Sequence, residues 1–423
     1  MITYQPPAGA RDLLPLDVAQ KHWIENRLEQ VFQRWGYHRI ITSTVERMDT
    51  LMAGGAIDQA AVIELQPVAG KRLGLRPELT ASIARTAVTR LARVTYPQRL
   101  YYNANVFRQA TQASHGGQQE FYQAGVELLG AGATVADAEV VLLLMDCLRS
   151  LRLDSWCLIL GDAQLTQALL APFAREQRQA VRQALATLDR VALETLDLPP
   201  ELHRHALDLL DLRGHPEDVL QTLGRLPLDS DTQTAVERLK SLVALVREVT
   251  QVEGGSQGPA GEGQPSSPAL TLDLSLIQPF DYYTGLVFEV VTGPEQGCQV
   301  LGQGGRYDHL LEVFQGQGQG QGFPGIGFVL NIEALHQALL PTGHLPQDTP
   351  PSDWLVVPTV PQAAAAAFTY AKTLRASASL VRAEVHLAAD EAPAATRDLA
   401  RQRRISRIAW IGPDGLPDIE ALN

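Results

Sequence analysis

The chain has 423 residues, too many for one ordinary hydrophobic core and suited to two or three domains. With 45% hydrophobic and 19% charged residues, its composition is that of a folded protein and excludes disorder over most of its length. The 35 basic and 47 acidic residues give a net charge of −12, which argues against a large positive surface for nucleic acid. No apolar run approaches the roughly 18 residues of a membrane helix, and the first residues lack the apolar block of a signal peptide.

The cysteines indicate the compartment. Cys147, Cys157 and Cys298 are odd in number, widely spaced and each next to apolar residues. Such a set predicts reduced, packed thiols, and neither a disulfide framework nor a metal site. We therefore expect a cytoplasmic protein with no metal and no other bound cofactor.

Helices and strands are predicted to alternate over the first part of the chain. Apolar residues at helical spacing indicate a helix over residues 18–35, and Gly36 is placed to end it. Two more helices are expected over 78–93 and 135–151. Strands are expected at 37–42, 98–106, 121–129 and 156–160.

The character of the sequence changes from residue 164 to residue 253, where Leu, Ala, Gln and Arg recur at helical spacing. This segment is predicted to be an all-helical insertion, broken at Pro199–Pro200 and at Gly214–Pro216. The stretch 254–268, rich in Gly, Ser and Pro, is expected to be a flexible loop. Insertion and loop divide a core that comprises residues 1–163 and 267–340.

Strand patterns return after the loop, and a second α/β unit follows. Strands are expected at 270–276, 284–291, 298–301 and 323–330, with the alternating Gln and Gly residues of 315–322 looping out of the core. After a proline-containing linker, strands at 353–358, 379–387 and 405–411 alternate with helices at 362–376 and 392–404. This βαβαβ order predicts a small module over residues 353–423 with a partly parallel sheet.

Six short segments, in order, resemble the core of class II aminoacyl-tRNA synthetases, specifically that of histidyl-tRNA synthetase. One glycine-rich match of this length arises by chance, whereas six in the correct order are specific. The Asp–Tyr–Tyr–Thr–Gly segment is the most telling because it characterises the histidine-specific branch. The segments are Gly9–Pro15, Leu75–Thr80, Phe107–Arg108 with Glu120–Glu127, Phe280–Glu289, Gly302–Asp308 and Gly325–Glu333.

The resemblance implies a fold and two adjoining pockets. The fold is α+β, an antiparallel sheet flanked by helices, and the pockets are for the amino acid and for ATP. The helical insertion matches the layout of that family. Residues 353–423 are similar, more weakly, to a truncated anticodon-binding domain.

Matched residue by residue, the histidine pocket is kept. Glu78 and Thr80 match residues that bind the α-ammonium group, Arg108 matches one that contacts ATP and the carboxylate, and Glu127 and Tyr283 match residues that contact the imidazole ring. Carboxylate, amide and hydroxyl groups suit the ammonium and ring nitrogens of free histidine. Residues four apart on a strand face the same side, as Gln123 and Glu127 would. The predicted histidine-binding residues are Glu78, Thr80, Arg108, Gln123, Glu127, Tyr282 and Tyr283.

The family's groups for ATP are absent at the matching positions. Amino-acid activation needs cations where charge builds on the phosphates. The loop Gln109–Gln119 contains neither an arginine nor an acid, Gln278 and Ala334 replace arginines, and Ser43 replaces the proline of the first motif. No catalytic residues are therefore expected. An inherited pocket without a ligand is the alternative, although a buried carboxylate without a partner is costly.

Three other polar features have a structural interpretation. Arg306 and Asp308 are expected to form a salt-bridged turn, and His115 is expected to lie exposed in its loop. Four arginines at the end of a predicted helix are interpreted as a solvated face, where cations also favour the helix dipole. They are Arg401, Arg403, Arg404 and Arg407.

A histidine pocket without ATP chemistry, on an acidic chain, resembles the regulatory subunit of ATP phosphoribosyltransferase. This resemblance implies a non-catalytic subunit that activates a short-form catalytic subunit and mediates histidine feedback in the first step of histidine biosynthesis. It also implies a self-dimer through the core, within a hetero-octamer, and no role for nucleic acid or membrane. A divergent histidyl-tRNA synthetase and a tRNA- or histidine-sensing adaptor are the alternatives.

Overall fold

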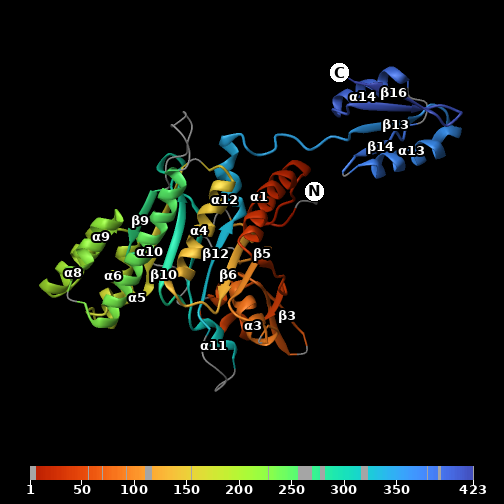
Figure 1. Ribbon diagram of the computed structural model, residues 1–423. Coiled ribbons are helices and arrows are strands. Elements are labelled where there is room, and N and C mark those ends of the chain that lie inside the picture. Colours follow the sequence, from red (N-terminus) through yellow and green to blue (C-terminus); the bar gives the residue numbers. More distant parts are fainter. Residues whose placement is uncertain are drawn as a thin grey trace. The chain divides into compact units, whose positions relative to one another are not determined.

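The structure is a computed structural model (Figure 1). It describes residues 6–55, 57–68, 70–91, 93–109, 117–153, 155–226, 228–255, 269–276, 282–315, 323–378, 380–388 and 392–422. The chain divides into two compact units, Met1–Pro346 and Gln347–Asn423.

A nine-stranded sheet forms the centre of the first unit. Its strand order is β1-β5-β6-β12-β11-β10-β7-β9-β8, and neighbours are antiparallel except for the pairs β1–β5 and β7–β9. The sequence-based expectation of an antiparallel sheet flanked by helices is thus confirmed. The strands are β1 (His38–Arg39), β5 (Gln98–Phe107), β6 (Glu120–Leu129), β7 (Trp156–Asp162), β8 (Arg213–Gly214), β9 (Ala269–Asp273), β10 (Leu286–Thr292), β11 (Val300–Arg306) and β12 (Gly325–Asn331).

The two faces of this sheet are covered differently. On β6, Ala124, Val126 and Leu128 belong to the large core beneath the helices α1 (Pro15–Arg34), α4 (Thr134–Ser150) and α12 (Ile332–Leu339). Side chains alternate along a strand, so Gln123 and Glu127 point together to the opposite face, as predicted. The helices α3 (Thr80–Thr89) and α11 (Leu310–Phe314) cover that second face.

A small three-stranded sheet lies beside α3 and was not predicted. Its order is β2-β4-β3, with β2 at Val45–Arg47, β3 at Glu64–Val68 and β4 at Lys71–Leu75. The short helix α2 (Met48–Met52) contacts β2 and β4. The predicted strand at 37–42 is also shorter than expected, since only the two residues of β1 pair.

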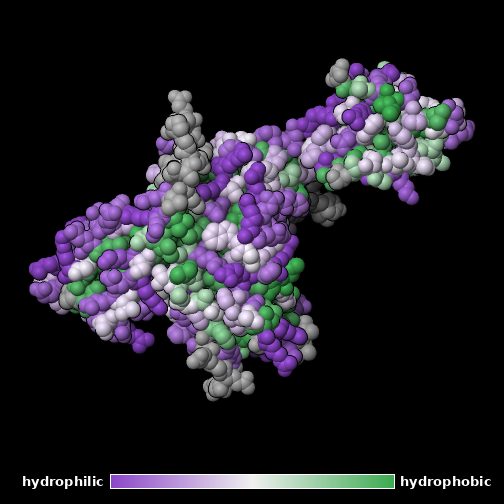
Figure 2. Space-filling model, viewed as in Figure 1, coloured by the Kyte–Doolittle hydropathy of each residue, from purple (hydrophilic) through white to green (hydrophobic). Residues whose placement is uncertain are grey.

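The insertion is almost entirely helical, and its buried side chains continue the core of the sheet. Val181, Leu193 and Leu223 belong to the same core as Leu158 and Leu160 of β7. On the face seen in Figure 2, these helices present mostly hydrophilic residues. One correction concerns Arg213–Gly214, which pairs with β9 as strand β8. The helices are α5 (Ala163–Leu170), α6 (Arg175–Ala186), α7 (Arg190–Thr195), α8 (Pro200–Leu210), α9 (Pro216–Leu223) and α10 (Ser230–Gly255).

The second unit is an α/β module with the predicted element order. The parallel strands β14, β13 and β15 are followed by an antiparallel edge strand, β16, which was not predicted. Ala-rich α13 packs on β13 and β14, and Ala400 of α14 packs on the other face. The elements are β13 (Trp354–Pro358), α13 (Ala364–Ser377), β14 (Ala383–Val385), α14 (Pro393–Gln402), β15 (Arg407–Ile411) and β16 (Pro417–Ala421).

The cysteine prediction is partly wrong. All three thiols are free, and Cys147 is fully buried, but Cys298 is exposed at a position with φ of 53°. Among the described residues, no group of three or more His, Cys, Asp or Glu side chains could hold a metal ion. No helix in that part of the chain has the length and apolar character to cross a membrane.

Candidate functional site

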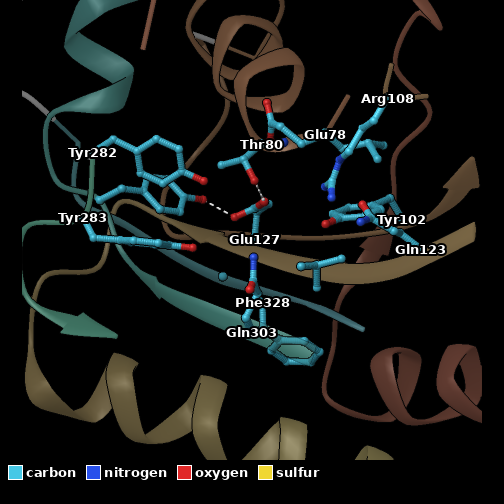
Figure 3. A pocket seen from close by; sticks show the side chains of 14 residues that line it. Glu78, Thr80, Tyr102, Arg108, Gln123, Glu127, Tyr282, Tyr283, Gln303 and Phe328 are labelled. Carbon is cyan, nitrogen blue, oxygen red and sulfur yellow. Dashed lines mark hydrogen bonds between the residues drawn. The ribbon is translucent and has the colours of Figure 1, made fainter. Parts of the chain in front are cut away.

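One cavity on the second face of the sheet brings together all seven residues predicted from the sequence. Glu78, Thr80, Arg108, Gln123, Glu127, Tyr282 and Tyr283 line it, together with residues that include Tyr102, Gln303, Tyr307 and Phe328 (Figure 3). The cavity has room for about 30 Å³, space for two or three water molecules at roughly 10–15 Å³ each. A larger ligand therefore requires lining side chains to move.

Glycines in the strands make this cavity possible. A Cβ atom at Gly305 would lie 2.7 Å from the ring of Tyr283, and one at Gly327 would overlap the carboxylate of Glu127. Both glycines come from the glycine-rich segments found in the sequence. Their missing side chains let large polar groups lie flat against the sheet.

Glu78 is placed by the start of helix α3. Its carboxylate accepts hydrogen bonds from the backbone N–H groups of Thr80 and Ala81, which have no partner within the helix. Burial raises the pKa of Glu78, while these N–H groups and the nearby Arg108 lower it. Glu78 is therefore a helix cap as well as a wall of the cavity.

Glu127 lies at the centre of the cavity and is only 2% exposed. It accepts a hydrogen bond of 2.7 Å from the Thr80 hydroxyl and a second from the Tyr307 hydroxyl (Figure 3). Burial raises its pKa to about 8, with a smaller contribution from the neighbouring Glu78. The two hydroxyl groups lower the pKa, but by less than burial raises it. Because the resulting pKa of Glu127 lies above 7, this carboxyl group holds a proton near neutral pH.

Arg108 contributes the cation among the described residues that line the cavity. Its Nε–H donates to the Pro77 carbonyl at 3.0 Å, and its guanidinium lies 5.8 Å from the ring centre of Phe121. Burial lowers the pKa of Arg108, and Glu78 partly restores it. Within the part of the chain that is described, its two terminal nitrogens donate no hydrogen bond, so they can take a carboxylate.

Tyrosines form the wall opposite Arg108. The ring of Tyr282 lies 4.8 Å from that of Tyr283 and 5.7 Å from that of Tyr307, both edge to face. Burial is the largest cause that raises the pKa of each of these hydroxyls. They therefore stay neutral and can donate or accept hydrogen bonds.

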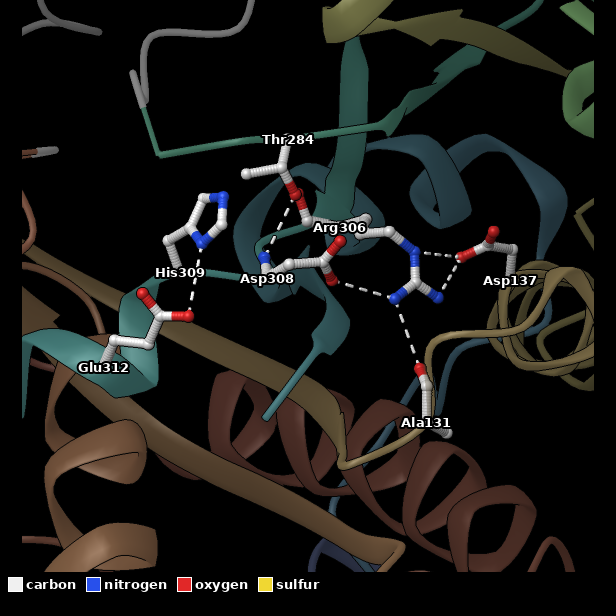
Figure 4. A network of polar contacts seen from close by, with 7 residues as sticks. All are labelled: Ala131, Asp137, Thr284, Arg306, Asp308, His309 and Glu312. Atoms are coloured by element: carbon white, nitrogen blue, oxygen red, sulfur yellow. Dashed lines mark hydrogen bonds and ion pairs between the residues drawn. The ribbon is translucent and has the colours of Figure 1, made fainter. Parts of the chain in front are cut away.

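The predicted salt-bridged turn at Arg306 and Asp308 is confirmed (Figure 4). Arg306 is 2% exposed, and its Nη1 donates to Asp308 at 3.0 Å and to the Ala131 carbonyl at 3.2 Å. Its Nε and Nη2 donate to Asp137 of α4 at 2.9 and 2.5 Å. Every arm of this guanidinium is engaged, so it is structural.

The positions that matched the family's ATP groups are described only in part. Ala334 is buried in the first turn of α12, where its backbone N–H donates to Asn331, and Ser43 donates to the Val45 carbonyl. Gln278, His115 and most of the loop from 109 to 119 lie outside the described residues. Since Arg108 is the cation of the cavity as described, a triphosphate would find little positive charge there.

Seven of the lining residues were not predicted as site residues: Leu79, Tyr102, Gln303, Tyr307, Gly327, Phe328 and Val329. Gln303 and Tyr307 belong to the recognised segment Gly302–Asp308, in which Arg306 and Asp308 were interpreted as a salt-bridged turn. Their direction depends on the register of β11 against β10 and β12. The alternation of that strand, once its register is known, is the signal that places them on the cavity face.

Comparisons with known proteins agree with this architecture. A family model described as histidyl-tRNA synthetase matches residues 9–335. Relatives from Nostoc sp. and Nostoc punctiforme, both named ATP phosphoribosyltransferase regulatory subunit, are each 56% identical, with 100% of both chains covered. A Bacillus halodurans structure named ATP phosphoribosyltransferase regulatory subunit/histidyl-tRNA synthetase has a TM-score of 0.78 at 25% identity, covering 97% of this chain and 99% of that one.

The fold and the cavity define a class II synthetase-like protein. Within that class, the chain belongs to the family of ATP phosphoribosyltransferase regulatory subunits, as its full-length relatives show. The histidyl-tRNA synthetase of the same Nostoc strain shares the fold with a TM-score of 0.76, at 20% identity over 100% of this chain and 97% of that one. The 56% identity to the regulatory subunits, over the whole of both chains, disfavours a divergent synthetase.

Proposed function

We propose that this chain is a non-catalytic subunit that activates a short-form ATP phosphoribosyltransferase catalytic subunit and carries its feedback inhibition by histidine. Family membership supports the partner, because the relatives are named as regulatory subunits of that enzyme. The cavity supports the effector. The observation that carries the proposal is that groups for each polar part of histidine line one buried site.

In this proposal, Arg108 binds the carboxylate of histidine. Its terminal nitrogens form the planar fork that pairs with a carboxylate through two parallel hydrogen bonds. The α-ammonium group of the ligand lies near Glu78, Thr80 and Gln123, where carboxylate, hydroxyl and amide oxygens are available.

The imidazole ring lies against Glu127 and Tyr283. In the described structure, Glu127 already accepts hydrogen bonds from Thr80 and Tyr307. Each oxygen of the carboxylate can accept a further hydrogen bond from a ligand ring N–H, but the ring needs more space than the present 30 Å³. The filled and empty pockets therefore differ in side-chain arrangement.

This difference is what feedback needs. An effector shifts an assembly between two arrangements only by the difference in its affinity for them. A coupling of about 1–3 kcal/mol changes activity or affinity by roughly 5- to 150-fold.

We place the self-dimer interface on the core, next to the exposed Ile41 and Val45. We place the hetero-octamer in the cytoplasm, where the three free cysteines stay reduced.

Calorimetric titration of the purified chain with histidine tests the pocket. We expect saturable binding that Glu127→Ala weakens at least tenfold, because an acceptor for the ring is lost. Glu312→Ala, which removes an exposed glutamate of α11, is the matched control and leaves the affinity unchanged. Absence of both heat and thermal shift up to millimolar histidine would leave an empty inherited pocket.

Two activity measurements test the rest of the proposal. Adding the chain to a short-form catalytic subunit raises phosphoribosyltransferase activity. Mixing the chain with ATP, histidine and tRNA yields no charged tRNA. Robust charging contradicts the non-catalytic role.

A further inference from the structure

Strand β11 places one long polar side chain on the cavity face. Gln303 stands opposite Val329 of β12 and Glu289 of β10. Its neighbours Gly302, Gly304 and Gly305 have no side chains, so Gln303 is the residue of the segment 302–305 whose side chain extends from the sheet. A Cβ at Gly305 would meet Tyr283, whereas one at Gly304 would meet Phe288 of the core, so Gln303 and Gly305 share the cavity face.

The carboxamide of Gln303 points toward Glu127 from the sheet side (Figure 3). It makes no hydrogen bond with any side chain or backbone group that the structure describes. A primary amide can donate and accept at once, so both functions are available to a ligand. Thr80 and Tyr307, by contrast, already donate to the carboxylate of Glu127.

We propose that Gln303 is a specificity-determining residue of this site, whose carboxamide recognises a second ring nitrogen of the ligand. The proposal rests on the histidine pocket proposed above and adds a contact to it. An imidazole has two nitrogens on different edges, and an ionised carboxylate can only accept. Glu127, which loses its proton when the ligand binds, therefore takes the N–H edge. Beside Tyr283, an amide that can donate or accept takes the other edge in either tautomer.

The chemistry predicts how strongly the site rejects a ring without nitrogen. A site built to hydrogen-bond a ligand rejects analogues that lack the group by roughly 10⁴–10⁵-fold, because its own buried groups are then left unpaired. The β-(2-thienyl) analogue of alanine keeps the ammonium, the carboxylate and a five-membered aromatic ring. Losing one of the two ring contacts should lower the preference for histidine over this analogue by about 10- to 100-fold.

Competition calorimetry with the full chain tests the proposal, using histidine and β-(2-thienyl)alanine as probes. We expect Gln303→Leu to lower the preference for histidine by about 10- to 100-fold, mostly through weaker histidine binding. Gln299→Leu changes a glutamine whose amide bonds to Gln337 outside the cavity, and it should leave the preference unchanged. If Gln303→Leu binds histidine with unaltered preference, the inference is overturned while the proposed function stands.

A second variant tests the proposal if Gln303→Leu does not fold. Gln303→Asn keeps the amide but shortens it by one methylene, and it should lower the preference for histidine without changing thermal unfolding. A normal preference in a folded Gln303→Asn chain also overturns the inference. Failure of the unaltered chain to bind histidine is a separate result, which removes the proposed function and this contact with it.

Discussion

At the scale of single residues, the protonation of Glu127 is the decisive property of the cavity. The group is buried beside Glu78, and its pKa rises to about 8. At neutral pH the folded, empty pocket therefore holds a proton that the unfolded chain, with an ordinary glutamate pKa near 4.5, has lost. Stability that depends on this group is present in full below about pH 4.5 and declines as pH rises toward 8.

Glu127→Gln should remove this pH dependence, because an amide imitates the protonated acid. We expect the variant to gain stability over the unaltered chain as pH rises from 5.5 to 8, by up to about 1.4 kcal/mol per pH unit. Denaturant unfolding of both chains at several pH values measures the difference. Parallel curves across this range contradict the raised pKa.

Histidine binding should release a proton from the same group. The cationic ammonium and a donating ring N–H favour the ionised carboxylate, so the affinity should rise with pH, by up to about tenfold from pH 7 to pH 8. Calorimetry in buffers of different ionisation enthalpy counts the released proton. The same observed heat in every buffer would contradict the release of a proton from Glu127.

At the scale of elements, a buried ionic contact ties the end of β11 to α4. Arg306 at the end of β11 joins Asp137 of α4 and Asp308 of the following turn. Their contribution is to position β11, and with it Gln303 and Tyr307.

Asp137→Ala should destabilise the fold by about 3 kcal/mol, because it leaves the Arg306 guanidinium buried with less compensation. The double variant Asp137→Leu, Arg306→Met removes both charges and should recover most of that loss. Chemical unfolding measures both free energies. A double variant less stable than the single one would show that the ion pair itself carries the stability.

The long strands and helices of the sheet were predictable, and the short ones were not. β5 and β6 begin and end within one residue of the expectation, since apolar side chains run through most of their length. The small β2-β4-β3 sheet was missed because β4 carries exposed Lys71 and Arg72 where a buried strand would be apolar. The seven site residues came from motifs, whereas the direction of Gln303 depends on register, which a single sequence does not show.

At the scale of the molecule, the lack of positive charge extends to the second unit. Residues 347–423 contain eight basic and nine acidic residues, a net charge of −1. Of the four arginines predicted at a helix end, Arg401, Arg403 and Arg404 lie at the end of α14, whereas Arg407 begins β15. All four are exposed, as expected, and each has a partner. Arg401 pairs with Asp398, Arg403 with Glu384 and Arg404 with Asp348, and Arg407 stacks on the Trp354 ring at 5.1 Å.

Such a surface should bind tRNA poorly, because phosphate contacts would have to break these internal pairs. We expect no saturable binding of histidine tRNA at micromolar protein in 150 mM salt. Filter binding, with a histidyl-tRNA synthetase as the positive control, measures it. Sub-micromolar binding that weakens steeply with salt contradicts this expectation and favours the tRNA-sensing adaptor.

The central claim is that histidine acts on the assembled enzyme through the Glu127 pocket. The most direct measurement is the inhibition of phosphoribosyltransferase activity by histidine in complexes reconstituted with either the unaltered chain or Glu127→Ala. We predict equal activation without histidine and a shift of the inhibition curve by at least tenfold in the variant complex. Identical inhibition curves would contradict the claim and move the effector site away from this pocket.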